Sequence, residues 1–147
     1  MKRTNGWMVV ILLLIAGLLV SGCGTQTSKA AAEKPVLLEK IEGSELNRVI
    51  LTEHAAQRLD IQTAAVREEQ VNGTQRLVVP YAAVIYDLKG ETWAYTSPAP
   101  LTFVRQAITV DFIEGDMAVL LDGPAAGTQV ATVGVAELYG ADTGVGK

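Results

Sequence analysis

The chain has 147 residues and a formal net charge of −4, and 49% of its residues are hydrophobic. This length suits one domain with a core of its own. The acidic balance argues against a nucleic-acid-binding protein, which would need a basic face. The single cysteine excludes an intramolecular disulfide, so apolar packing must stabilise the folded part.

Residues 1–22 have the pattern of a bacterial lipoprotein signal peptide that ends at Cys23. Two basic residues near the start precede an apolar run that is too short for a membrane span of about 20 residues. The small residues Ser21 and Gly22 stand directly before Cys23. We therefore expect Cys23 to be acylated, so that its lipid holds the mature chain on the extracytoplasmic side of a membrane. An uncleaved anchor helix and an ordinary secreted protein are the alternatives.

Residues 23–46 are predicted to form a flexible, lipid-anchored tether. Small and polar residues dominate at first, and charged residues follow around Pro35 and Gly43. Such a composition buries too little apolar surface to become ordered. The apolar patch at residues 36–38 departs from this composition and is a candidate for docking against another surface.

The folded domain is predicted over residues 47–147 and is all-β. A short strand at residues 49–51 precedes a helix at residues 53–59, for which Thr52 is the expected N-cap. Asn72-Gly73 predicts a tight hairpin, because both residues tolerate positive φ. Further strands are predicted at residues 61–71, 77–79, 82–86, 92–96, 101–112, 117–121 and 128–135. Short strands separated by turns favour a small antiparallel β-barrel, roll or sandwich with one short helix.

Few residues offer chemistry. His54 is the only histidine, so a Ser-His-Asp triad would depend on it, and a surface or cap position is expected instead. Asp111 and Glu114 are two carboxylates of the kind that glycosidases use. Acidic residues are common at turns, however, so the pair is not expected to be catalytic. The glycines at residues 144–146 precede no helix and form no nucleotide loop. We predict no enzyme activity, no cofactor and no metal site.

Two aromatic residues, Trp93 and Tyr95, alternate along one predicted strand and should share a face of the sheet. A core or interface role is expected for them rather than sugar stacking.

Several short motifs follow one another along the second half of the chain. They are Val79-Pro80-Tyr81-Ala82-Ala83-Val84-Ile85-Tyr86-Asp87, Thr92-Trp93-Ala94-Tyr95, Phe103-Val104-Arg105, Gly115-Asp116, Gly123-Pro124-Ala125-Ala126-Gly127 and Glu137-Leu138-Tyr139-Gly140. This stretch resembles the C-terminal region of the periplasmic adaptor subunits (membrane fusion proteins) of resistance-nodulation-division (RND) efflux systems. Residues 49–66 resemble the opening strand-and-helix segment of the same adaptors. The resemblance implies that these two regions pair as a membrane-proximal β-domain that rests on a transporter.

The chain departs from the adaptor pattern in its middle. Between the two regions, full adaptors insert a lipoyl-like domain, a β-barrel and usually also a long helical hairpin. In this chain only residues 67–79 connect the two regions. The resemblance therefore implies a free-standing membrane-proximal domain that does not reach an outer-membrane channel.

The expected function is that of a membrane-anchored, non-enzymatic accessory of an RND efflux complex. Its expected partners are the membrane, through the lipid, and a transporter or full-length adaptor, and self-association is also possible. Exposed residues of the predicted strand 101–112 are the expected contact surface, Phe103 and Arg105 first, with Trp93 and Tyr95 beside them. Ordinary sheet positions are the competing interpretation. Alternative functions are a ligand-binding or structural lipoprotein, and an adaptor remnant.

Overall fold

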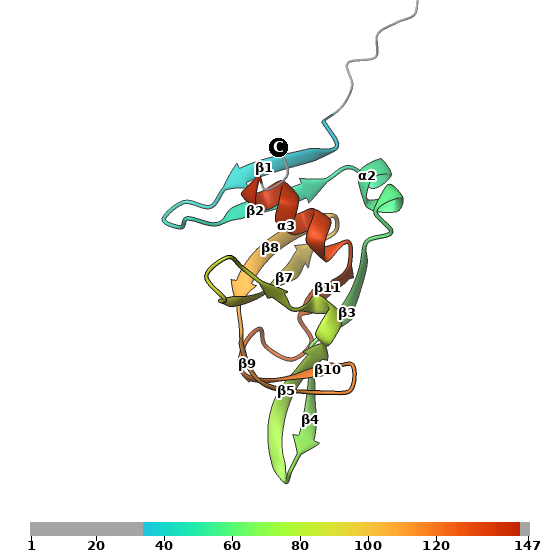
Figure 1. Ribbon diagram of the computed structural model, residues 1–147. Coiled ribbons are helices and arrows are strands. Elements are labelled where there is room, and N and C mark those ends of the chain that lie inside the picture. Colours follow the sequence, from blue (N-terminus) through green and yellow to red (C-terminus); the bar gives the residue numbers. More distant parts are fainter. Residues whose placement is uncertain (1–33, 145–147) are drawn as a thin grey trace, which may run out of the picture. The chain divides into compact units, whose positions relative to one another are not determined.

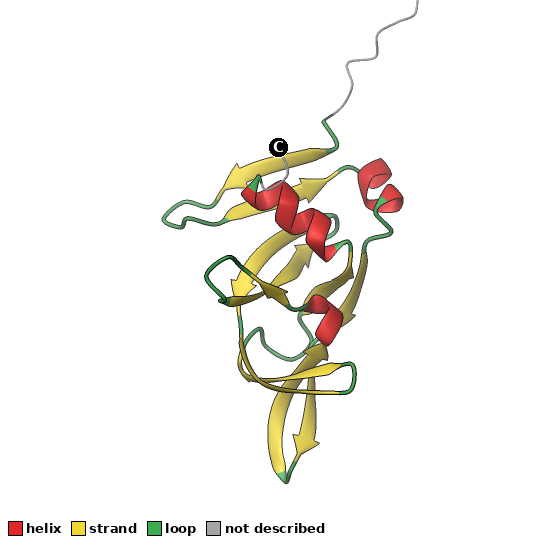
Figure 2. Ribbon diagram, viewed as in Figure 1, coloured by secondary structure: helices red, strands yellow, loops and turns green. Residues whose placement is uncertain are grey.

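The computed structural model describes residues 34–144, in which strands predominate (Figure 1, Figure 2). The predicted signal peptide, Cys23 and the first part of the predicted tether lie outside the described residues. The strands are β1 (Val36–Lys40), β2 (Asn47–Leu51), β3 (Gln62–Ala65), β4 (Arg67–Val71), β5 (Thr74–Pro80), β6 (Ile85–Tyr86), β7 (Thr92–Ala99), β8 (Thr102–Ala107), β9 (Thr109–Glu114), β10 (Met117–Asp122) and β11 (Gln129–Val133). The helices are α2 (Glu53–Arg58), the 3₁₀ turn η1 (Tyr81–Ala83) and α3 (Val135–Thr143).

The strands form two antiparallel sheets. One has seven strands in the order β1-β2-β8-β7-β11-β3, with β6 also paired to β7, and the other has four in the order β4-β5-β10-β9. The all-β prediction is confirmed, but the sheets are not closed into a barrel.

The chain passes from one sheet to the other at Val66 and at Ile108. The predicted strands 61–71 and 101–112 are wrong as continuous strands, because each divides at one of these residues. Both side chains are buried. The Val66 N–H donates to the Thr128 carbonyl at 2.8 Å, and the Ile108 N–H donates to the Thr92 carbonyl at 3.0 Å. Each crossing thus places an apolar side chain between the sheets while its backbone remains hydrogen-bonded.

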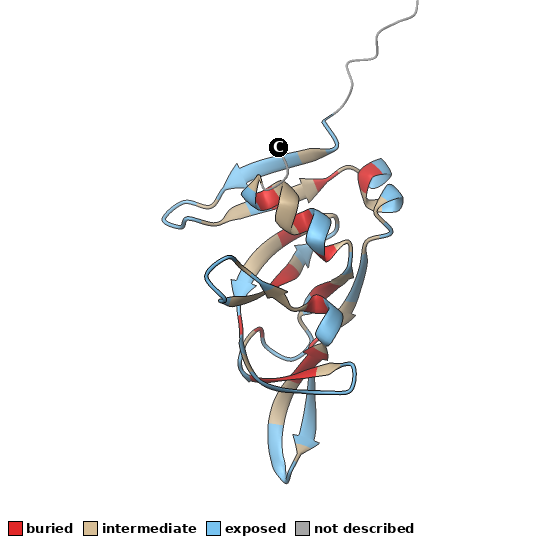
Figure 3. Cartoon of the chain, viewed as in Figure 1, coloured by how far each residue is buried: buried red, intermediate tan, exposed pale blue. Residues whose placement is uncertain are grey.

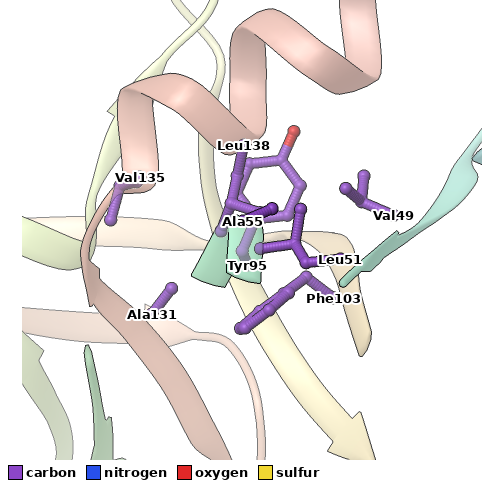
Figure 4. Packing of buried hydrophobic residues seen from close by; sticks show 8 residues of the cluster. All are labelled: Val49, Leu51, Ala55, Tyr95, Phe103, Ala131, Val135 and Leu138. Carbon is purple, nitrogen blue, oxygen red and sulfur yellow. The ribbon is translucent and has the colours of Figure 1, made fainter. Parts of the chain in front are cut away.

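The seven-stranded sheet is covered on both faces. Ala94 and Val130 lie in the core between the sheets, whereas their neighbours Tyr95 and Ala131 lie in the core beneath the helices. The core between the sheets also contains Val66, Val79, Ala83, Ile108, Ala118 and Leu120. The core beneath the helices consists of Val49, Leu51, Ala55, Tyr95, Phe103, Ala131, Val135 and Leu138 (Figure 4).

Helix α2 follows its prediction closely. The Thr52 hydroxyl accepts a 3.2 Å hydrogen bond from the Ala55 N–H, as an N-cap should. Helix α3 was not predicted. The predicted strand 128–135 includes its first residue, Gly134 supplies no side-chain cap, and Gly140 weakens the helical pattern. Val135 and Leu138 are buried, so tertiary packing stabilises this helix.

Strand β1 lies within the segment predicted to be a flexible tether. It pairs with β2 from Val36 opposite Leu51 to Lys40 opposite Asn47. The Thr52 N–H also donates to the Pro35 carbonyl at 3.1 Å. The folded part therefore includes residues 36–40. The composition of the tether does not predict this strand, because its order depends on pairing with β2.

Two other local predictions need correction. Tyr81–Ala83 form a 3₁₀ turn rather than a strand, since the Val84 N–H bonds back to the Tyr81 carbonyl at 3.0 Å. Strand β7 continues through the predicted break to Ala99. Its pairing with β8 is irregular between Thr96 and Ala99, which accommodates a proline that has no N–H to donate.

The predicted hairpin at Asn72-Gly73 is confirmed. These residues have φ values of 51° and 78° and connect β4 to β5. The tip of this hairpin is exposed and extends beyond the other strands of its sheet (Figure 3).

Candidate functional site

Three of the predicted site residues, Trp93, Tyr95 and Arg105, meet at a polar cluster between the seven-stranded sheet and α3. Tyr95 on β7 and Arg105 on β8 stand opposite each other in register. The Arg105 guanidinium carbon lies 4.6 Å from the ring centre of Trp93 and 5.8 Å from that of Tyr139. Cation–π attraction to two rings therefore holds this guanidinium. The prediction that Trp93 and Tyr95 share a face is confirmed.

Asp142 on α3 provides the anion of this cluster, and its side chain is 1% exposed. One carboxylate oxygen, Oδ2, accepts a 2.8 Å hydrogen bond from the Tyr95 hydroxyl and lies 3.4 Å from Arg105 Nε. The other, Oδ1, accepts a 3.0 Å bond from the Asn47 amide. Among the described residues the Arg105 Nε has no hydrogen-bond partner, so Arg105 and Asp142 are an ion pair without a direct hydrogen bond there. Burial, followed by the bond to Asp142, raises the pKa of the Tyr95 hydroxyl far above its usual value.

This cluster attaches α3 to the sheet, which changes the role expected for the predicted contact residues. Phe103 is 3% exposed and Tyr95 is 0% exposed. The expectation that Phe103 is an exposed contact residue is therefore wrong, because the unpredicted helix α3 covers that face. Arg105 is largely buried and faces Asp142, and Trp93 is half-buried beside it. The role of Asp142 could not be predicted from the sequence, because a single acidic residue near the end of the chain has no pattern that distinguishes it from a solvent-exposed one.

The residues considered for catalysis are not brought together. His54 is exposed on α2. Asp111 pairs with Arg76 at 3.1 Å, and Glu114 is exposed at the end of the same strand. Between residues 34 and 144, no three His, Cys, Asp or Glu side chains are grouped so that they could hold a metal ion.

A groove lies between the β6–β7 turn and β9. Its volume is about 760 Å³. It is lined by Tyr86 and residues 90–93 and by the seven consecutive residues 107–113, which run from the end of β8 through the crossing at Ile108 into β9. The side chains lining the groove include the carboxylates of Glu91 and Asp111 but no lysine or arginine.

The turn beside this groove has a hydrogen-bonded backbone and an exposed leucine at its tip. One Asp87 carboxylate oxygen accepts hydrogen bonds from the N–H groups of Lys89 and Glu91, at 2.8 and 2.9 Å, and the other accepts from the Trp93 indole at 3.2 Å. Partial desolvation acts to raise the pKa of Asp87, but these bonds outweigh it and lower the pKa below its ordinary value. Leu88, at the tip, is 94% exposed.

No protein-family model, curated protein or solved structure matches this chain. None of the helices in the described part has the length and apolar character needed to cross a membrane.

Proposed function

We propose that this chain is a lipid-anchored, extracytoplasmic binding module that acts as a non-enzymatic accessory of an RND efflux complex. Cys23 would carry the lipid, and the folded part would contact a transporter or a full-length adaptor. The proposal combines the lipoprotein pattern of residues 1–23 with the adaptor-like order of motifs in the folded part.

The observation that carries this proposal is the pairing of the two regions that resemble adaptors. In the structure β2 pairs with β8, Val49 standing opposite Phe103, and β3 pairs with β11. The opening segment and the C-terminal region thus form one sheet, which supports the expected membrane-proximal arrangement.

The connection between these regions also supports an adaptor-like module without a long extension. Arg67 to Pro80 form the short hairpin of β4 and β5 at the place where full adaptors insert their further domains. The described part of the chain therefore offers side surfaces for contact rather than a long arm.

A small-molecule cup, the main alternative from the sequence, has less support. The sheets are not closed into a barrel, and packed apolar side chains fill the space between them.

The test is co-purification from gently solubilised membranes after crosslinking, with a C-terminal tag and Cys23 intact. The matched control is Cys23→Ser, which removes the acylated thiol and leaves the folded part unchanged. We expect an RND transporter or a full-length adaptor to be recovered with the intact chain and lost with Cys23→Ser. Recovery of the chain alone, under conditions that preserve known efflux complexes, would contradict the proposal.

A further inference from the structure

The two outer strands of the four-stranded sheet differ in how they are protected. Strand β4 presents a series of exposed polar and charged side chains, Arg67, Glu68, Glu69 and Gln70. Strand β9 instead exposes two apolar side chains, Phe112 and Ile113, and an exposed apolar edge strand is prone to pair with a further strand. Within this sheet, β9 is therefore the edge better suited to accept one.

The groove lies along the edge of β9. Successive side chains of a strand point to opposite faces of its sheet. Asp111 interrupts this alternation, because the pairing of β9 with β10 shifts register there. Phe112 and Ile113 pair regularly with Val119 and Ala118, so their side chains point to opposite faces, yet both line the groove. The groove therefore follows the outer edge of β9, with which no other described strand pairs.

Apolar side chains border this edge on both sides. Phe112 and Ile113 on β9 are 36% and 39% exposed, and Tyr86 across the groove is 53% exposed. Leu88 projects from the turn that Asp87 fixes through its hydrogen bonds. These bonds fix the backbone of the turn, so presenting Leu88 to a partner costs little backbone conformational entropy on binding.

The charges indicate what kind of strand would fit. Glu91 and Asp111 line the groove, and Glu114 and Asp116 follow at the end of β9. Arg76 neutralises Asp111 at 3.1 Å, so the remaining carboxylates are the ones open to a partner. A second copy of β9 would bring further carboxylates and no base, so charge disfavours self-pairing.

We infer that an extended segment of a partner protein, with apolar residues alternating with lysine or arginine, binds in this groove and adds a strand to β9. Main-chain hydrogen bonds would give affinity, and alternate side chains would meet the apolar and acidic positions of the groove. This inference rests on the proposed binding function and assigns its contact surface.

The test places a photo-crosslinking residue at position 112 or 88 of the full chain in its membrane, with Cys23 intact. The matched control is the same residue at Gln70 on β4, which is also exposed and lies at the opposite edge of the same sheet. We expect positions 112 and 88 to crosslink to one extended, basic segment of another protein, and position 70 to give no product.

A synthetic peptide of the captured segment then provides the second readout. It should slow hydrogen exchange at the amides of residues 110–113. Glu91→Lys should weaken its binding about fivefold, the upper range for one exposed ion pair, whereas Glu68→Lys on β4 should not.

The outcomes separate this inference from the proposed function. Products from position 70 alone, a product of two copies of this chain, a captured segment without basic residues, or a peptide that leaves β9 exchange unchanged would each overturn the inference and leave the binding function standing. Absence of a product from all three positions would also overturn the inference, while recovery of the chain alone in the co-purification would overturn the proposed function.

Discussion

The hydroxyl of Tyr95 donates a 2.8 Å hydrogen bond to the carboxylate of Asp142, which lies 47 residues later in the chain. This bond joins a central strand of the larger sheet to the C-terminal helix. The same carboxylate lies 3.4 Å from Arg105 Nε. One acidic side chain therefore attaches α3 to the sheet.

Replacing Asp142 should destabilise the fold strongly. Asp142→Ala leaves the Arg105 cation largely buried without its anion, and removing one partner of a buried ion pair costs about 3–5 kcal/mol. Because Arg105 retains slight exposure and two aromatic neighbours, we expect the lower end, about 3 kcal/mol in the free energy of unfolding by urea titration. Glu137→Gln, on the exposed side of α3, is the control and should cost about 0.5 kcal/mol or less. A loss below about 1 kcal/mol for Asp142→Ala would mean that the cluster does not hold the helix.

The Tyr95 hydroxyl should make stability fall at alkaline pH. Its folded-state pKa is raised above the ordinary 10.0, mainly by burial and then by Asp142. The native state therefore keeps a proton that the unfolded state releases above about pH 10, so the free energy of unfolding decreases as pH rises beyond that value. Denaturation midpoints measured from pH 8 to pH 11 should show this decline. Tyr95→Phe should flatten it, and an unchanged decline in that variant would refute the assignment.

Gly134 should tolerate alanine much less well than Gly127 does. Both have positive φ, 77° and 86°. A Cβ at Gly134 would collide with Cδ1 at the end of the Ile61 side chain, whereas at Gly127 nothing lies within 4 Å. Both variants share the backbone cost, so their difference measures the packing conflict with Ile61. Because the end of the Ile61 side chain can shift, we expect the lower end of the usual overpacking cost, about 1 kcal/mol. Equal thermal stability of the two variants would show that the turn before α3 is loosely packed.

The turn that presents Leu88 should loosen in acid. The pKa of Asp87 is below its ordinary value, because hydrogen bonds from Glu91, Lys89 and Trp93 outweigh desolvation. A depressed pKa stabilises the turn above the pKa of the unfolded state, and the effect is lost as pH falls through the folded-state pKa. The indole N–H resonance of Trp93 should therefore shift and exchange faster in strong acid, and Asp87→Ala should show the same behaviour at neutral pH. A Trp93 indole resonance unaffected by Asp87→Ala would contradict this account.

Features set by neighbouring residues could be predicted from the sequence. The N-cap at Thr52 and the hairpin at Asn72-Gly73 depend on local backbone chemistry, and both are confirmed. The crossings at Val66 and Ile108 could not be predicted, because periodicity along one strand does not reveal that the strand changes sheets.

The candidate site was only partly predictable for a similar reason. The alternation of side chains along a strand predicts that Trp93 and Tyr95 share one face of the sheet, as do Phe103 and Arg105. It does not predict whether that face is exposed to solvent. Helix α3 covers this face and so removes it from solvent. The helix is stabilised by Leu138 and Asp142, which pack against strands distant in the sequence. The groove along β9 joins two segments that only the fold brings together.

The most direct test of the account is the accumulation of a fluorescent efflux substrate in cells that lack this chain. If the chain supports an RND complex, the dye should accumulate more in those cells than in the parent. The intact chain should restore efflux, and Cys23→Ser, present in equal amount, should not. Accumulation that is unchanged on loss of the chain, or restored equally by Cys23→Ser, would contradict a membrane-anchored role in efflux.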